Sequence, residues 1–119
     1  MNKSTLVVGA SENPQRYSYL AINRLVENKV QPIYAVSLKS GEVSGVPFMT
    51  EFPDFKVDTV TLYVGPRHQE AVAAYMEKYP PNRVIFNPGT ESPLMDSLKS
   101  KGVAVLPACT LVMLASNQY

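Results

Sequence analysis

The sequence has one cysteine, one histidine and no long apolar run among its 119 residues. A single cysteine, Cys109, excludes an internal disulfide and supplies too few thiolates for a metal site. No segment approaches the roughly 18 consecutive apolar residues of a membrane-spanning helix, and the apolar run that ends at Gly9 is too short for a signal peptide. The eleven basic and ten acidic residues form no cluster of one sign. These absences predict a cytoplasmic, soluble protein that binds neither nucleic acid nor a membrane.

Apolar segments alternate with amphipathic ones along the whole chain. Five segments rich in β-branched and other apolar residues are typical of buried strands, namely 5–8, 32–36, 57–64, 83–86 and 103–106. Residues 17–28 carry apolar side chains at helical spacing, a second helix is expected from Pro66 to about Lys78, and a third runs from capping residues at 90–93 toward Gly102. Residues 37–55 are irregular and predict a long loop with one short strand or helical turn. The apolar segment 111–114 predicts a closing helical turn or strand.

Strands that are apolar on both faces and separated by amphipathic helices favour a parallel sheet covered on both sides. The length and the 45% hydrophobic content suit one domain over residues 1–119. We therefore expect an α/β fold with a doubly wound, Rossmann-like sheet of about five strands. In such sheets the ligand lies beyond the carboxyl ends of the strands. Four loops make that edge here, at 9–17, 37–45, 65–68 and 87–91, and the first faces the third if strand 5–8 neighbours strand 57–64.

The first loop carries groups that suit a phosphate. A glycine at its start allows a tight turn and a close backbone approach, and the following helix offers free N–H groups and a favourable dipole. The loop adds side-chain donors from Ser11, Asn13, Arg16 and Ser18. Only Gly9 of the three-glycine dinucleotide fingerprint is present. An ordinary strand-to-helix turn with capping residues therefore stays open as the alternative.

The second loop bears on the identity of the cofactor. Enzymes that use NAD place an acidic residue after the second strand, where it binds the ribose hydroxyls. This chain has Lys39 there, and a lysine favours a phosphate on the ribose, as in coenzyme A or NADP. A solvated surface lysine is the competing interpretation.

The sequence resembles the family of small bacterial CoA-binding proteins, whose fold is that of the CoA-binding domain of the succinyl-CoA synthetase α subunit. The resemblance lies in V-V-G-A-S at 7–11, N-P at 13–14, R-Y-S at 16–18, D-T-V at 58–60, F-N-P-G-T-E at 86–91 and A-C-T at 108–110, and it covers essentially the whole chain. It implies binding of coenzyme A or an acyl-CoA, with a phosphate site at Gly9, Ala10, Ser11, Asn13, Arg16 and Ser18. It further implies a ribose-phosphate contact at Lys39, and contacts along the cofactor from Gly65, Pro66, Arg67, Asn87, Pro88, Gly89 and Thr90.

Two departures from the family limit what the resemblance implies. Relatives often have an asparagine-proline pair before the lysine, where this chain has Ser37-Leu38. The synthetase also uses further domains and a phosphorylated histidine. The chain has no histidine in a comparable setting, so the ligase activity does not carry over.

No catalytic constellation is evident. His68 lies at a helix start, which disfavours a protonated imidazole and favours an exposed polar role. Cys109 follows the last strand and is interpreted first as a small buried apolar residue. Glu91 and Thr90 are first of all helix caps. We expect a binding module without catalysis, with an NADP-dependent reductase or a CoA-linked thiol enzyme using Cys109 as the alternatives. A domain for protein contacts, or a homo-oligomer, also stays open.

Overall fold

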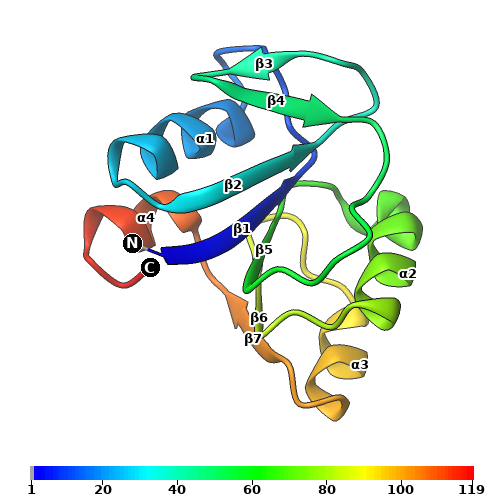
Figure 1. Cartoon of the computed structure of the whole chain (residues 1–119). Coiled ribbons are helices and arrows are strands. Elements are labelled where there is room, and N and C mark those ends of the chain that lie inside the picture. The colour runs from blue at the N-terminus through cyan, green and yellow to red at the C-terminus, as the bar shows by residue number, and fades with distance from the viewer. Residues whose placement is uncertain (1) are drawn as a thin grey trace.

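The computed structural model describes residues 2–119. Its strands are β1 (Asn2–Val8), β2 (Gln31–Val36), β3 (Glu42–Val43), β4 (Val46–Met49), β5 (Thr59–Leu62), β6 (Arg83–Phe86) and β7 (Ala104–Pro107). They form one seven-stranded sheet in the order β3-β4-β2-β1-β5-β6-β7 (Figure 1). All neighbouring strands are parallel except β3 and β4, which form an antiparallel hairpin.

The six parallel strands, counted along the chain, follow the order 3-2-1-4-5-6 of dinucleotide-binding sheets. This confirms the predicted doubly wound α/β fold. The expected strand count of about five was too low, because the irregular segment 37–55 contains both β3 and β4. These strands are short, and glycine and proline in this segment mask the two-residue period of a strand.

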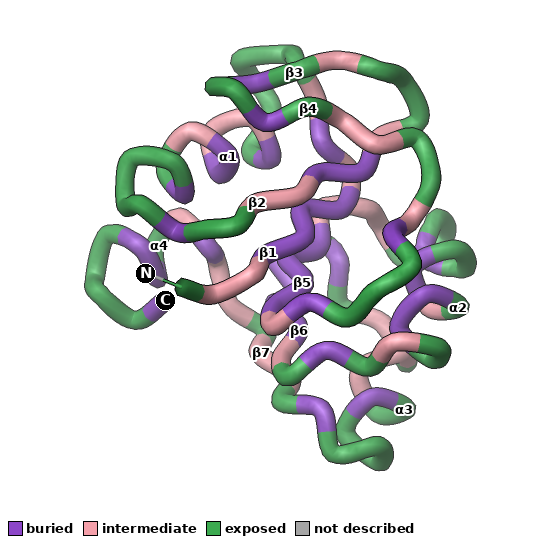
Figure 2. Tube along the Cα trace, viewed as in Figure 1, coloured by how far each residue is buried: buried purple, intermediate pink, exposed green. Residues whose placement is uncertain are grey.

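Helices cover both faces of the sheet. They are α1 (Tyr17–Glu27), α2 (Glu70–Lys78), α3 (Leu94–Ser100) and α4 (Thr110–Ala115), with a short 3-10 helix η1 (Pro66–His68) before α2. Helices α1 and α4 lie on one face and α2 and α3 on the other (Figure 1). The apolar segment 111–114, which was expected to form a helical turn or a strand, lies within α4. Figure 2 shows the buried residues concentrated along the central strands β1 and β5.

The apolar core has two layers because the sheet is buried on both faces. Alternate residues of a strand point to opposite faces, so Leu6 and Val8 of β1 belong to the core layer beneath α2 and α3. Val7 belongs to the layer beneath α1 and α4. This explains why the strand segments are continuously apolar rather than alternating.

The helix expected to start at Pro66 is interrupted at Gln69, which lies between η1 and α2. The Gln69 side chain is buried, and its Nε2 donates to the carbonyl oxygens of Val64 (3.1 Å) and Thr90 (2.7 Å). The Ser92 hydroxyl donates to Gln69 Oε1 (2.6 Å). Gln69 thus joins the loops that follow β5 and β6, a role that the sequence pattern did not reveal.

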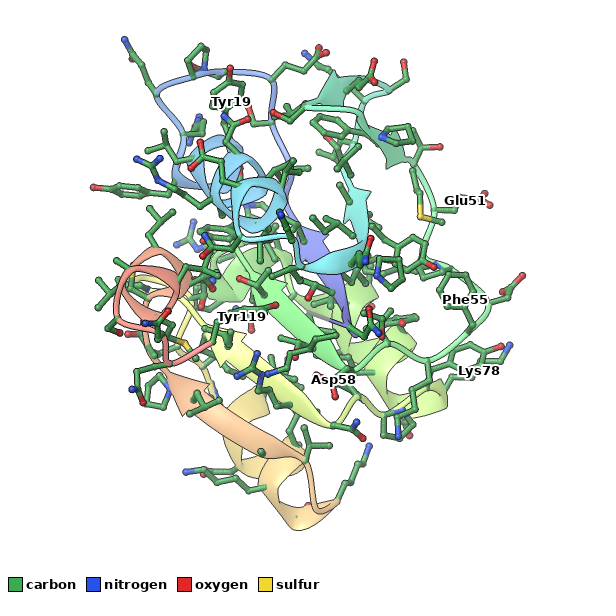
Figure 3. The ribbon with its side chains drawn as sticks, turned by 60° about the vertical axis from the view of Figure 1, so that its left-hand side comes forward. Tyr19, Glu51, Phe55, Asp58, Lys78 and Tyr119 are labelled. Atoms are coloured by element: carbon green, nitrogen blue, oxygen red, sulfur yellow. The ribbon has the colours of Figure 1, made fainter. Side chains whose placement is uncertain are left out.

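The amino ends of the strands are closed by Tyr119, which is buried there with Asp58 nearby (Figure 3). The Tyr119 hydroxyl lies 2.6 Å from Thr5 Oγ1, and the Tyr119 ring lies 4.4 Å from the Arg83 guanidinium carbon. Lys3 Nζ and Arg83 Nη1 both donate to the main-chain oxygen of Tyr119. This end of the sheet is thereby filled by the protein's own side chains, opposite to the expected ligand edge.

Candidate functional site

The carboxyl ends of the six parallel strands form one edge, where the four loops predicted to hold a ligand begin. Strand β1 pairs with β5 from Thr5↔Thr59 to Val8↔Leu62. The loops after β1 and β5 are therefore neighbours, as expected. The order in which successive strands are added to the sheet reverses at β1, since β2 lies on one side of β1 and β5 on the other. Open α/β sheets bind ligands at this switch point.

Gly9 ends β1 in a conformation that favours glycine, with φ +94°. A Cβ built on Gly9 would lie 3.0 Å from Val64 Cγ1 and 3.2 Å from the carbonyl carbon and oxygen of Tyr63. The amide groups of Gly9 and Ala10 both donate to the Val36 carbonyl, each at 3.0 Å. The first loop thus crosses closely over the end of β5, and a larger residue would push the two loops apart.

Polar side chains of the first loop are engaged in shaping it. Ser11 Oγ accepts from the Asn13 amide and Asn13 Oδ1 accepts from the Gln15 amide, each at 3.0 Å. The Arg16 amide donates to the Asn13 carbonyl at 3.0 Å. The Ser11 hydroxyl hydrogen and the Asn13 Nδ2 hydrogens are not used in these bonds. Both side chains are therefore ordered and still have donors to offer to an anion.

The loop leads into the N-terminus of α1. Arg16 is the N-cap residue, and no side chain caps the first turn. The first N–H groups of a helix and its dipole favour an anion at such an end. The side chains of Arg16 and Tyr17 are exposed, whereas Ser18 is buried in the first turn. The first turn of α1 and the Arg16 guanidinium are therefore accessible to an anion, whereas the Ser18 side chain is buried beneath them.

Glu12 joins the first loop to the second, a contact that sequence reasoning missed. Its Oε2 accepts from the Glu42 amide at 3.0 Å. A Cβ on Gly41 would lie 2.8 Å from Glu12 Cδ, so the two segments touch. Glu12 therefore holds the end of the segment that carries Lys39. No local signal predicts this bond, because its partners are 30 residues apart.

The second loop is exposed. Lys39 is exposed, and its amide donates to Ser37 Oγ at 3.3 Å. The neighbouring Leu38 side chain is fully exposed. The loop thus presents a cation and an apolar side chain to solvent at the end of β2.

Loops three and four contain exposed and buried members of the predicted site. Gly65 is half-buried, and Pro66 and Arg67 of η1 are exposed, as are Pro88 and Gly89. Asn87 and Thr90 are buried. The side chains of both residues are engaged in hydrogen bonds within the protein, so these two predicted ligand contacts are occupied by structural bonds.

Asn87 ties three elements together. Its Nδ2 donates to Thr61 Oγ1 (2.8 Å) and to the Leu62 carbonyl (2.9 Å), and its Oδ1 accepts from the Thr110 amide (2.8 Å). Thr90 Oγ1 donates to the Asn87 carbonyl at 2.7 Å. Asn87 thereby links β5, the end of β6 and the first residue of α4, while Thr90 closes the turn that follows β6.

The chain matches a known family over almost its whole length. A family model described as "CoA binding domain" matches residues 3–115. The chain belongs to the CoA-binding domain family. A search of the curated proteins gave no significant match.

Solved structures of similar proteins agree with this fold. A crystal structure described as that of an uncharacterized protein is 40% identical, has a TM-score of 0.93, and covers 100% of this chain and 99% of that chain. A hypothetical protein from Pyrococcus horikoshii OT3 is 24% identical with a TM-score of 0.83, covering 96% and 82% of the two chains. A Thermus thermophilus structure is 20% identical with a TM-score of 0.83, covering 98% and 90%. At these identities the last two support the fold alone.

His68 and Cys109, the two side chains weighed for catalysis in the sequence, lie on different elements of this CoA-binding domain. His68 is exposed on η1, and Cys109 is half-buried at the N-cap of α4. Within residues 2–119 no side-chain hydrogen bond joins either of them to an ionisable partner, and no group of three His, Cys, Asp or Glu residues is placed to hold a metal ion. In the same part of the chain, no helix is long and apolar enough to cross a membrane.

Cys109 lines a pocket of about 60 Å³ beside the expected ligand edge. The pocket is lined by Tyr17, Tyr63, Asn87, Pro88, Cys109 and Leu111. Burial raises the pKa of Tyr63 to about 12, so its phenol stays neutral at physiological pH. Cys109 itself is half-buried in the pocket wall. It is therefore not the fully buried apolar residue that the sequence suggested first.

Proposed function

We propose that this CoA-binding domain holds coenzyme A or an acyl-CoA across the carboxyl edge of its sheet, as a binding module without catalysis of its own. The observation that carries the proposal is the first loop. Gly9 brings the start of the loop against Tyr63 and Val64, which follow β5, and the loop ends at the N-terminus of α1, whose N-cap residue Arg16 makes no side-chain cap. Family membership supplies the ligand class, and the loop supplies a place for the phosphates.

The pyrophosphate would lie at the first loop. The main-chain N–H groups of Tyr17 and Ser18 in the first turn of α1 and the α1 dipole would attract it, and the exposed guanidinium of Arg16 suits bidentate binding of a phosphate. The unused donors of Ser11 and Asn13 would complete the site. Ala10 would shape the loop rather than bind the phosphate, since its side chain is buried and its amide donates to the Val36 carbonyl.

The ribose phosphate would contact Lys39 at the second loop. Its exposed ammonium group is free to reach a phosphate, and the adjacent Leu38 would be covered by the adenine ring. Covering a fully exposed leucine would add a favourable hydrophobic contribution. An exposed leucine and lysine side by side are thus consistent with a nucleotide at the end of β2.

The rest of the cofactor would run past loops three and four. Gly65, Pro66 and Arg67 would line one side, with Pro88 and Gly89 on the other. Asn87 and Thr90 would act through the loop shape that their internal bonds hold, rather than by binding the ligand with their side chains. His68 lies exposed on η1 beside this path.

Calorimetric titration with CoA, 3′-dephospho-CoA, NADP and NAD tests the proposal. We expect CoA to bind and the dinucleotides to give negligible heat. Lys39→Ala should weaken CoA by ten-fold or more, since a charge-assisted phosphate contact contributes about 1.5–3 kcal/mol, and should weaken dephospho-CoA by less than two-fold. Lys101→Ala, an exposed lysine after α3, serves as the control. Equal losses of affinity for CoA and dephospho-CoA in Lys39→Ala would refute the role of Lys39. Absence of CoA binding by the wild-type protein would refute the proposed function.

A further inference from the structure

The pocket beside Cys109 is formed by residues far apart in the sequence that meet at the carboxyl ends of β5 and β6. Tyr17 is the first residue of α1, Tyr63 directly follows β5, and Leu111 lies in the first turn of α4. Asn87 and Pro88 complete it from the loop after β6. The pocket therefore adjoins the segment that would guide the far end of the cofactor.

The chemistry of the pocket wall is apolar and uncharged. Both Nδ2 donors and the Oδ1 acceptor of Asn87 are bonded to Thr61, Leu62 and Thr110, so this side chain has little left to offer a guest. Tyr63 is a neutral phenol at physiological pH. The remaining lining side chains contain no cation. A guest group must therefore be neutral and small to be favoured here.

We propose that this pocket receives the sulfur end of the cofactor, as the free thiol or as a short neutral acyl thioester such as acetyl. The inference rests on the proposed binding of CoA and adds the class of acyl group. A buried water needs roughly 10–15 Å³ of such space, so about 60 Å³ accommodates a handful of non-hydrogen atoms. A thiol with its neighbouring methylenes, or an acetyl thioester, is of that size.

The span of the sheet agrees with this placement. Lys39 lies after β2, and the pocket lies at the end of β6, three strand positions away in the order β2-β1-β5-β6. With neighbouring strands about 4.8 Å apart, this separation is roughly 14 Å. The flexible arm of the cofactor can cross that distance, so the nucleotide and the sulfur end occupy different places on one edge.

Acyl groups that carry a charge or a long chain should be disfavoured. A carboxylate, as in a succinyl group, would lose hydration in the pocket and gain no cation, only the single hydroxyl donor of Tyr63, which has no other hydrogen-bond partner among residues 2–119. A chain of eight carbons exceeds the available volume and would have to leave its apolar tail in solvent. The pocket thereby distinguishes free and acetylated cofactor from succinyl and octanoyl forms.

The test compares the free thiol, three thioesters and one nucleotide fragment by calorimetry. We expect CoA and acetyl-CoA to bind within a few-fold of each other, and succinyl-CoA and octanoyl-CoA at least ten-fold more weakly. The fragment 3′-phospho-ADP, which lacks the arm, reports on the nucleotide site alone. Similar affinity for acetyl-CoA, succinyl-CoA and octanoyl-CoA would overturn the proposal.

Filling the pocket provides the second arm of the experiment. Leu111→Trp should weaken acetyl-CoA at least ten-fold and leave 3′-phospho-ADP within two-fold, which also shows that the variant is folded. Val112→Trp is the matched control, because Val112 is the next residue of α4, is 63% exposed and does not line the pocket. Unchanged acetyl-CoA binding by Leu111→Trp would refute the pocket while leaving the proposed function intact. If the wild-type protein binds neither CoA nor 3′-phospho-ADP, the proposed function itself is refuted.

Discussion

Replacing Gly9 by alanine should destabilise the protein through two separable effects. The first is the backbone, since φ +94° is a conformation that residues with a Cβ rarely adopt, at a cost of about 1–2 kcal/mol. The second is crowding. The new Cβ would lie 3.2 Å from the carbonyl atoms of Tyr63 and 3.0 Å from Val64 Cγ1. Tyr63 directly follows β5 and its amide donates to the Val8 carbonyl at 2.9 Å, so its backbone cannot move aside without disturbing that bond.

The two effects can be given rough magnitudes. Overpacking of a tight site costs about 1–3 kcal/mol, while alanine recovers about 0.4–1 kcal/mol by restricting the unfolded chain. Gly9→Ala should therefore lower the free energy of unfolding by about 2–4 kcal/mol. This is a large part of the roughly 5–15 kcal/mol of a typical domain, and it corresponds to a fall in Tm of roughly 10 °C.

Gly45→Ala isolates the backbone effect. Gly45 also has a positive φ, +84°, but nothing lies within 4 Å of the position its Cβ would take. The free energy of unfolding of this variant should fall by only about 1 kcal/mol. Urea unfolding of both variants without ligand, followed by circular dichroism, measures the difference. If Gly9→Ala loses no more free energy of unfolding than Gly45→Ala, close packing against Tyr63 and Val64 is not the reason for glycine at position 9.

Three further predictions follow from particular contacts. Asn87→Ala should lower the free energy of unfolding by about 2–4 kcal/mol, because it leaves buried groups of three elements without partners; urea melts check this, and a loss below 1 kcal/mol would contradict it. Glu12→Ala should speed hydrogen exchange at the Glu42 amide, whereas Glu12→Gln, which keeps an acceptor oxygen, should largely preserve protection; equal exchange in both variants would show that the bond is unimportant. For Asp58, burial acts to raise its pKa, but hydrogen bonds from Thr59 and Asn82 and the charges of Arg83 and Lys3 outweigh it and lower the pKa below its ordinary 3.8. Its stabilising contribution is therefore present above pH 3.8 and is lost as pH falls through the lowered folded-state pKa, so Asp58→Asn should be less stable than wild type at pH 7 and approach it in acid, as measured by Tm against pH.

Much of the architecture is predictable from local patterns in the sequence. The apolar runs around Leu6, Val60 and Ile85 identified central strands, because a strand buried on both faces must be apolar throughout. Helical spacing located α1 closely. The hairpin of β3 and β4 was missed, since its two short strands are stabilised by pairing and by packing rather than by a strong pattern of their own.

The candidate site was predictable as a set of loops and only partly as a set of contacts. The resemblance to the family implies phosphate contacts at Gly9, Arg16 and Lys39, which stay predictions, and the parallel topology brings the loops that carry these residues to one edge. Glu12 was missed because its partner is distant in the sequence. Asn87 was predicted as a ligand contact, but its side chain is engaged in three internal bonds.

The sequence by itself determined the elements of this protein and its family, because hydrophobic period, turn residues and motifs are local properties of the chain. The tertiary structure alone decided which loops touch, which polar side chains remain available to a ligand, and that residues from Tyr17 to Leu111 enclose one pocket. These features depend on strand order and side-chain packing between distant segments, and distant segments become neighbours only when the chain has folded.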